Sequence, residues 1–261
     1  SIATYDSPLV EGVLLPLMSL GAIAFPIHYA VLEKRDPRAF LADLQTRWLL
    51  VLLGVGVVAL SAQNLLVTTD AFAGGWLGLE TLGLTAAQAD ALRDSVFQFV
   101  SALSCTGFQS APIGGWGAGS KLLLSGAMVL GGAAGSTVGG IKVIRGYTIA
   151  RGIGWQFSRG FLPASAVVTV EMGDRVLGRT EMEREFAEAA IVSLLWLLVL
   201  LAGSFVLVNV VPAEFTYADA LFEVASAQGN VGLSVGITGP SMSPLAEAMF
   251  VLNMWVGRLE I

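Results

Sequence analysis

Two segments of the sequence carry residues through which a cation could be bound by backbone oxygens. Residues 97–108 read FQFVSALSCTGF and residues 222–233 read FEVASAQGNVGL. At a shift of 125 residues they align without gaps, with identical Phe, Ser, Ala and Gly and with similar Gln/Glu and Phe/Leu pairs. This self-similarity indicates an internal repeat.

Each copy predicts a short helix followed by an extended segment centred on a glycine, Gly107 or Gly232. Glycine permits the dihedral angles that turn consecutive carbonyl groups the same way, and the carbonyl end of the helix adds negative potential. The glycine-centred parts, residues 104–108 and 229–234, contain no Asp or Glu. Such a neutral oxygen cage suits a monovalent cation, whereas a divalent cation prefers carboxylates. A pair of helix–turn packing motifs is the alternative interpretation.

A second candidate site is the segment 131–140, which reads GGAAGSTVGG. Each glycine costs a helix about 1 kcal/mol relative to alanine, so the segment predicts a break in an apolar helix. The freed amides and the hydroxyls of Ser136 and Thr137 could bond locally or face a pore. Close packing of two membrane helices through glycines at four-residue spacing is the alternative. The glycines are Gly131, Gly132, Gly135, Gly139 and Gly140.

Arg258 is a third candidate, because it lies in the apolar run 244–261. A charged side chain within a membrane helix costs several kcal/mol and usually faces the interior of the protein or a wet cavity. The alternative is an arginine that extends to the cytoplasmic interface and pairs with Glu260.

The composition of the chain predicts the membrane environment that these sites require. Of the 261 residues, 55% are hydrophobic and 13% are charged, against about 25% charged in an average soluble domain. The mean hydropathy is +0.74. The net charge of −6 offers no basic patch for nucleic acid, and Cys105, as the single cysteine, cannot form an intramolecular disulfide. One histidine and no acidic cluster within the apolar runs argue against an intramembrane enzyme.

Long apolar runs predict the membrane-spanning helices, since about 20 residues cross a bilayer core. Two shorter runs, 95–104 and 217–227, cannot span and have the length of re-entrant segments. Irregular backbone at membrane depth is tolerated only where it is buried in protein or lines a wet cavity. The expected spans are residues 9–32, 48–67, 122–144 and 186–211, with a fifth run at 244–261.

The distribution of Lys and Arg predicts the orientation. Segments 33–47 and 142–184 are rich in both, whereas segment 70–95 has one such residue and segment 212–245 has none. Because positive charge gathers on the cytoplasmic side, the first two segments are expected there. Both re-entrant runs are then expected to enter from the outside.

These motifs together resemble the Trk/Ktr/HKT superfamily of potassium and sodium transporters. The resemblance rests on residues 104–108 with 229–234, on residues 131–145, and on the closing MWVGRLEI at 254–261, in the family's order and spacing. The Leu-Glu-Ile ending is similar to the Trk branch. The family implies an all-α membrane fold in which four helix–pore loop–helix repeats surround one pore.

By this resemblance the chain is roughly the second half of such a protein, truncated at both ends and lacking the N-terminal half of the same pore. The expected third and fourth repeats lie at 47–152 and 187–261, the latter with a truncated inner helix. Residues 1–32 would be the inner helix that ends the second repeat. A cytoplasmic linker at 33–46 and a cytoplasmic connector at 153–186 would join these parts.

The resemblance also implies the site residues. Glycine at both Gly107 and Gly232 goes with potassium, whereas serine at one such position goes with sodium in some plant members; Cys105 departs from the commoner Thr or Ser. Arg258 would project into the pore and repel a cation. Potassium would be held at filter carbonyls of Cys105, Thr106, Gly107, Phe108, Asn230, Val231, Gly232 and Leu233. The gate would comprise Gly131, Gly132, Gly135, Ser136, Thr137, Gly139, Gly140, Lys142 and Arg258.

The function implied is potassium uptake across the cell membrane by a multi-pass, non-enzymatic transporter without a cofactor, driven by the membrane potential. The implied partners are membrane lipid, the other half of the pore, a second copy as a homodimer, and a cytosolic nucleotide-binding regulatory subunit, with no nucleic acid. The alternatives are a sodium-permeable or ion-coupled cation symporter and a broken-helix secondary transporter for an organic solute. The repeats of the last class are often inverted, whereas these two enter from one side.

Overall fold

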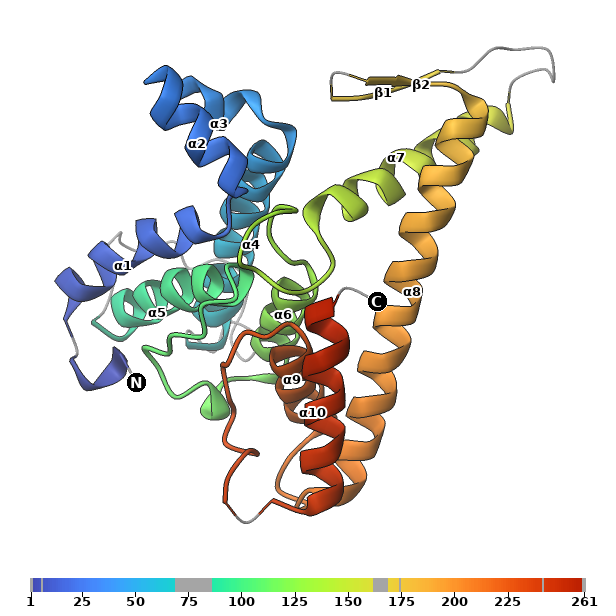
Figure 1. Ribbon diagram of the computed structural model, residues 1–261. Coiled ribbons are helices and arrows are strands. Elements are labelled where there is room, and N and C mark those ends of the chain that lie inside the picture. The colour runs from blue at the N-terminus through green and yellow to red at the C-terminus, as the bar shows by residue number, and fades with distance from the viewer. Residues whose placement is uncertain are drawn as a thin grey trace.

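The computed structural model describes residues 2–5, 7–68, 86–161, 169–173, 175–240 and 242–259, and these form a helical membrane fold with one small hairpin (Figure 1). The short elements are η1 (Ile2–Thr4), α3 (Arg38–Ala42), η2 (Ile113–Gly115), β1 (Val170–Met172) and β2 (Arg175–Leu177). The longer helices are α1 (Pro8–Gly21), α2 (Phe25–Lys34), α4 (Leu44–Thr68), α5 (Ala86–Leu103), α6 (Ala118–Val129), α7 (Val143–Arg159), α8 (Arg179–Val210), α9 (Tyr217–Gln228) and α10 (Pro244–Leu259).

Helices α4 and α8 are the described helices long and apolar enough to span a membrane singly, which confirms the spans predicted at 48–67 and 186–211. The run predicted to span at 9–32 is not one straight helix. The chain bends by 101° between α1 and α2. The two helices are long and apolar enough to cross a membrane only when they are taken together. Ala24 is extended, and Pro26 opens α2 without an amide hydrogen to donate. Hydropathy alone detects the apolar run but not this break.

The other apolar runs also differ in detail from the prediction. The run at 122–144 is helical only as far as Val129, and α10 has 16 residues. Helix α9 matches the short run at 217–227, but α5 has 18 residues where the run at 95–104 predicted about half of that. Its first half reads AAQADALRD, which contains good helix formers that an apolar window does not detect.

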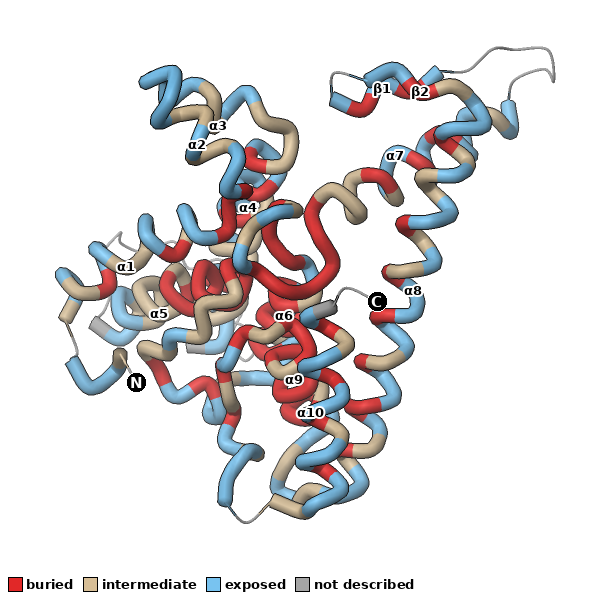
Figure 2. Tube along the Cα trace, in the orientation of Figure 1, coloured by how far each residue is buried: buried red, intermediate tan, exposed pale blue. Residues whose placement is uncertain are grey.

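Some helices lie at the buried centre of the fold, and others lie around it with one side exposed (Figure 2). The facing parts of α5, α6 and α9 are buried, whereas α8 exposes one long side. On α8 a buried stripe with a helical spacing of three and four residues faces the centre: Ser193, Trp196, Leu200, Gly203 and Leu207. The exposed side carries Ile191, Leu194, Leu195, Leu198, Leu201 and Phe205. An apolar face turned outward is what a lipid-facing helix requires.

Glycine permits the closest helix contacts. A Cβ atom added to Gly56 of α4 would lie 1.8 Å from the ring of Phe99 in α5. One added to Gly257 of α10 would lie 1.6 Å from the carbonyl oxygen of Gln228, at the end of α9. Small residues let membrane helices approach in this way, and here they let α5 and α9 pack closely against their neighbours.

A buried ion pair joins α6 to α9. The Nζ atom of Lys121 lies 2.5 Å from Oδ1 of Asp219, and the two side chains are 8% and 7% exposed. Lys121 also donates to the carbonyl oxygen of Gly114, at 2.8 Å. The other carboxylate oxygen of Asp219 accepts from the amide and hydroxyl of Thr216, and so caps α9. The pair therefore fixes both the position and the first turn of α9.

The two strands form an antiparallel hairpin beside the ends of α7 and α8 (Figure 1). Its buried residues pack with both helices in a small separate core of Trp155, Val170, Met172, Leu177 and Met182. The hairpin lies in the segment predicted to be a cytoplasmic connector. It leaves the all-α membrane class unchanged.

We expect Gly56→Ala to lower the free energy of unfolding by about 1–3 kcal/mol, the usual cost of overpacking. The added methyl group would meet the buried ring of Phe99. Gly54→Ala is the matched control on the same helix, because a Cβ there meets nothing within 4 Å. It should leave stability unchanged or slightly raised. Thermal unfolding in detergent measures both, and equal melting temperatures for the two variants would contradict the packing account.

We expect Lys121→Met to destabilise the protein by about 3–5 kcal/mol, because it leaves the buried Asp219 carboxylate without its countercharge. The double variant Lys121→Met/Asp219→Asn should recover most of that loss, since no charge then stays buried. The same melting assay compares both with the parent. A double variant as unstable as the single one would show that Lys121 acts by packing rather than by charge.

Candidate ion filter and gate

The two repeated segments fold in the same way after their helices. Loop A, residues 104–108, follows α5, and loop B, residues 229–233, follows α9. In each loop three backbone amides donate to carbonyl oxygens of the preceding helix, at positions that match under the shift of 125 residues. In loop A the bonds are Ser104 to Val100, Cys105 to Ala102 and Thr106 to Ser101; in loop B they are Gly229 to Ala225, Asn230 to Ala227 and Val231 to Ser226.

The dihedral angles of the loops repeat as well. Cys105 and Gly107 have φ values of 49° and 72°, and the equivalent Asn230 and Gly232 have 54° and 99°. In an ordinary strand successive carbonyl groups point in opposite directions, and left-handed residues alter that alternation. Glycine accepts such angles without strain, and asparagine does so more readily than most residues. The sequence repeat thus corresponds to a repeat of backbone conformation.

The structure brings loops A and B into contact. A Cβ atom on Gly107 would lie 2.0 Å from the carbonyl oxygen of Val231. A Cβ on Gly232 would meet only the Cα of Gly107, at 3.9 Å. Leu233 is buried, whereas Phe108 is 37% exposed. The predicted filter residues of both copies therefore lie together, with room for a side chain at Gly232 but not at Gly107.

Side chains that the sequence analysis did not assign hold the two loops in place. The hydroxyl of Ser101 donates to the carbonyl oxygen of Phe108, and the equivalent Ser226 accepts from the amide of Gly232. Both serines are identical in the repeat, so the signal was present in the sequence.

A second pair of equivalent residues anchors the chain beyond each loop. Gln98 donates to the hydroxyl of Ser110, and the carboxylate of Glu223 accepts from the hydroxyl of Ser234 and the amide of Val235. Glu223 is 3% exposed. Its charge is therefore used to hold the chain after loop B.

The glycine-rich loop, residues 130–142, joins α6 to α7 without helical structure. Its two ends are tied to each other. The amide of Gly131 donates to the carbonyl oxygen of Ile141 at 2.8 Å, the amide of Ile141 to Val129 at 2.8 Å, and the amide of Val143 to Gly132 at 3.1 Å. The predicted break in the helix is therefore a closed loop, and packing of a continuous helix through its glycines does not occur here.

The far side of the glycine-rich loop binds the break between α1 and α2. The amide of Ala133 donates to the carbonyl oxygen of Ala22, and the amide of Phe25 donates to Gly135, both at 3.1 Å. The hydroxyl of Thr137 donates to the carbonyl oxygen of Gly21. Two interruptions of helical structure, more than 100 residues apart, thus satisfy each other's backbone groups.

The same loop also contacts α4 and loop B. The amide of Ala134 donates to the side-chain oxygen of Gln45, at 2.8 Å. A Cβ atom on Gly139 would lie 2.2 Å from the carbonyl oxygen of Gly229. The glycine-rich loop therefore lies directly against the first residue of loop B, and only a glycine fits at that point.

Two of the predicted gate side chains brace the loop itself. The hydroxyl of Ser136 donates to the carbonyl oxygen of Ala133 at 2.6 Å, and the buried amine of Lys142 donates to that of Val138. Lys142 is 5% exposed. Its amine therefore acts within the loop, and it does not reach the surface as a cytoplasmic lysine would.

Arg258 reaches the glycine-rich loop from α10. Its Nη1 donates to the carbonyl oxygen of Thr137 at 3.2 Å. From the same helix the carbonyl oxygen of Met254 accepts from the side-chain amide of Asn230, also at 3.2 Å. Helix α10 thus contacts both loop B and the glycine-rich loop. The alternative partner of Arg258, Glu260, lies outside the described residues.

The arrangement presents neutral oxygen atoms near two positive side chains, Lys142 within the glycine-rich loop and Arg258 from α10. Across the described part of the chain, no three His, Cys, Asp or Glu side chains gather as ligands for a metal ion. Neutral carbonyls suit a weakly hydrated monovalent cation. The guanidinium of Arg258 would oppose such a cation by Coulomb repulsion.

Comparison with known proteins extends these observations. The sequence profile of TrkH, described as a cation transport protein, matches residues 1–261. The Trk system potassium uptake protein TrkH of Halomonas elongata is 28% identical over 261 residues, covering 100% of this chain and 50% of that protein. An uncharacterized cation transporter of Methanocaldococcus jannaschii is 26% identical over 266 residues, covering 100% and 48%.

The crystal structure of the potassium transporter TrkH from Vibrio parahaemolyticus has the same fold. The TM-score is 0.80 at 22% sequence identity, and the match covers 100% of this chain and 52% of that one. The chain spans about half the length of the curated relatives it matches.

These matches confirm the predicted superfamily, the all-α membrane fold and the multi-pass location in the cell membrane. The matching family model is described as that of a cation transport protein. By sequence profile over its whole length, and by fold, the chain belongs to the TrkH family of cation transport proteins.

Proposed function

We propose that the protein takes up potassium ions across the cell membrane through a selectivity filter formed by backbone carbonyls of loops A and B. The observation that carries this proposal is the matched left-handed pattern at Cys105 and Gly107 and at Asn230 and Gly232. Loops of one conformation, each held by its own helix and in contact with the other, are what a symmetric oxygen cage requires. Potassium is the substrate, and no cofactor takes part.

Three features favour potassium over other cations. The described backbone of loops A and B offers neutral oxygens, which suit a monovalent ion. Glycine occupies the central position of both loops, at Gly107 and Gly232. Several relatives are named potassium uptake proteins, among them those of Halomonas elongata and Escherichia coli. A sodium-permeable or ion-coupled cation symporter is the competing function.

The proposed pore needs more protein than this chain supplies. Loops A and B would form half of the filter, and the corresponding N-terminal half of the pore would supply the rest. We further propose that two such pores assemble as a homodimer. A cytosolic nucleotide-binding subunit would bind at the exposed ends of α7 and α8, where the ion pairs Arg159–Glu183 and Arg175–Glu185 lie near the hairpin.

The glycine-rich loop and Arg258 would form the gate. The loop lies against Gly229, at the start of loop B, and Arg258 binds the loop at Thr137. A cation leaving the filter would meet the loop and the positive charge of Arg258. Entry would be driven by the membrane potential, which supplies about 2.3 kcal/mol per charge per 100 mV.

Serine at the two filter glycines should have unequal effects. At both positions φ is positive, so serine is strained, but only at Gly107 would its Cβ meet a carbonyl oxygen, that of Val231. We expect Gly232→Ser to keep rubidium flux and to admit sodium. Gly107→Ser should abolish the flux of both ions. Rubidium and sodium uptake into liposomes that carry the complete protein measures this.

The parent protein is the reference in the same assay, with potassium as a competitor of rubidium. Equal sodium and rubidium flux in the parent would contradict selectivity for potassium and favour the sodium-permeable alternative. Rubidium uptake that needs a sodium or proton gradient would favour a symporter. Identical behaviour of the two serine variants would contradict the filter geometry.

Removal of the charge at Arg258 should speed conduction. Arg258→Gln eliminates the positive charge and weakens the bond to Thr137, so rubidium flux should rise about tenfold, which corresponds to a barrier lower by about 1.4 kcal/mol. Arg258→Lys keeps the charge and should stay close to the parent. The same flux assay measures both variants.

Arg145→Gln on α7 is a control that removes one arginine elsewhere. If it raises flux as much as Arg258→Gln does, the effect comes from net charge and not from the gate. If Arg258→Gln and Arg258→Lys both leave flux unchanged, Arg258 is not part of the barrier.

A further inference from the structure

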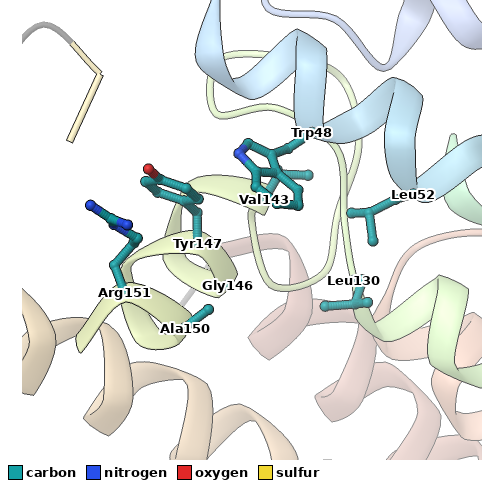
Figure 3. Close-up of a pocket in the computed structure, with 8 residues that line it drawn as sticks. All are labelled: Trp48, Leu52, Leu130, Val143, Gly146, Tyr147, Ala150 and Arg151. Atoms are coloured by element: carbon teal, nitrogen blue, oxygen red, sulfur yellow. The ribbon is translucent and has the colours of Figure 1, made fainter. Parts of the chain in front are cut away.

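A cavity of about 500 Å³ lies between α4, α7 and the start of the glycine-rich loop. It is lined by Trp48, Leu52, Leu130, Val143, Gly146, Tyr147, Ala150 and Arg151 (Figure 3). Its volume is within the range of ligand-binding pockets in proteins. None of the side chains that line it was assigned above to the filter or the gate.

The cavity has an apolar end and a polar end. Figure 3 shows Leu52 and Leu130 on one side, with the hydroxyl of Tyr147 and the guanidinium of Arg151 on the opposite side. The rings of Trp48 and Tyr147 also line the cavity, and their centroids lie 5.7 Å apart. A ligand that fits has an apolar tail and a polar head.

A second cavity of about 440 Å³ adjoins the polar end and shares Trp48, Tyr147 and Arg151 with the first. It adds Arg47 from the first turns of α4 and Glu171 from the hairpin. Arg151 donates to the backbone carbonyl of Glu171, at 3.2 Å, which places the guanidinium beside this cavity. The lining of this second cavity includes Arg47, Arg151 and Glu171, so its net charge is positive. A polar head bound there would face this positive charge.

The position in the membrane agrees with this polarity. Arg47 and Arg151 belong to the arginine-rich segments expected on the cytoplasmic side. Tryptophan and tyrosine are typical of the membrane interface, and anionic lipids are attracted to basic residues there. We therefore propose that the two cavities form a binding site for an anionic phospholipid, with its headgroup between Arg47 and Arg151 and one acyl chain against Leu52 and Leu130.

The occupied site would contact both ends of the glycine-rich loop. Leu130 is the first residue of that loop, and Val143 follows its last. An acyl chain in the cavity would therefore pack against the region where the two ends are tied together. The binding site does not depend on the proposed potassium pathway, and its test below measures lipid proximity rather than ion flux.

The test uses the complete protein in vesicles that contain either phosphatidylglycerol or phosphatidylcholine with brominated acyl chains, at equal mole fraction. Bromine quenches tryptophan fluorescence on contact, and the signal of Trp48 is the difference between the protein and its Trp48→Phe variant. We expect brominated phosphatidylglycerol to bind about fivefold better at Trp48, the ratio that corresponds to about one basic residue near an anionic headgroup.

Charge variants identify the source of the preference. The double variant Arg47→Gln/Arg151→Gln should quench equally with both lipids, whereas Arg47→Lys/Arg151→Lys should keep the preference. Arg35→Gln/Arg38→Gln removes two arginines from the neighbouring cytoplasmic segment, outside both cavities, and should also keep it. The retained preference in the lysine variant separates loss of charge from loss of folding.

Three results would overturn the proposal. Equal quenching by both lipids in the parent would show that the site does not select an anionic headgroup. No quenching of Trp48 by either lipid would show that protein covers the cavity. A preference that persists in Arg47→Gln/Arg151→Gln, or that disappears equally in Arg35→Gln/Arg38→Gln, would assign it to the general charge of the membrane surface.

Discussion

A backbone amide or carbonyl at membrane depth must find a partner within the protein or face a wet cavity, because lipid offers no hydrogen bonds. Helices α4 and α8 meet this requirement internally. Loops A and B and the glycine-rich loop have no regular helical hydrogen bonds, so other bonds must hold them. Loops A and B bond back to the helices that precede them, and the glycine-rich loop bonds to itself and to the break between α1 and α2. The irregular segments therefore depend on hydrogen bonds to their neighbours for their conformation.

Several polar side chains supply such partners. Gln98 donates to the hydroxyl of Ser110 beyond loop A, and Glu223 accepts from the amide of Val235 beyond loop B. Gln45 accepts from the amide of Ala134, and Lys142 donates to the carbonyl oxygen of Val138. The ion pair of Lys121 with Asp219 fixes the helix from which loop B starts. Charge inside this protein therefore mostly supports backbone geometry. Arg258 also binds the backbone, at the carbonyl of Thr137, but its side chain is exposed.

The sequence predicted what depends on local pattern. Apolar length predicted α4, α8 and α9, and the shift of 125 residues paired Cys105 with Asn230 before their dihedral angles were known. It did not predict the bend between α1 and α2, since the partners of that break lie at residues 133–137. Nor did it pair Lys121 with Asp219, which are 98 positions apart. Hydropathy also missed the polar first half of α5.

The two attachments of the glycine-rich loop differ in kind. At its base, the two ends of the loop are hydrogen-bonded to each other. These bonds would stay intact if the loop moved as a rigid unit. Its outer side is held by single bonds to Gly21, Ala22, Phe25, Gln45 and Arg258. Each contributes about 1 kcal/mol net, so the whole outer attachment is worth a few kcal/mol. Binding of an effector typically delivers a coupling free energy of about 1–3 kcal/mol, which would offset some of these bonds but not all of them. In the proposed gate, opening would therefore break the bonds of the outer side and leave those of the base intact.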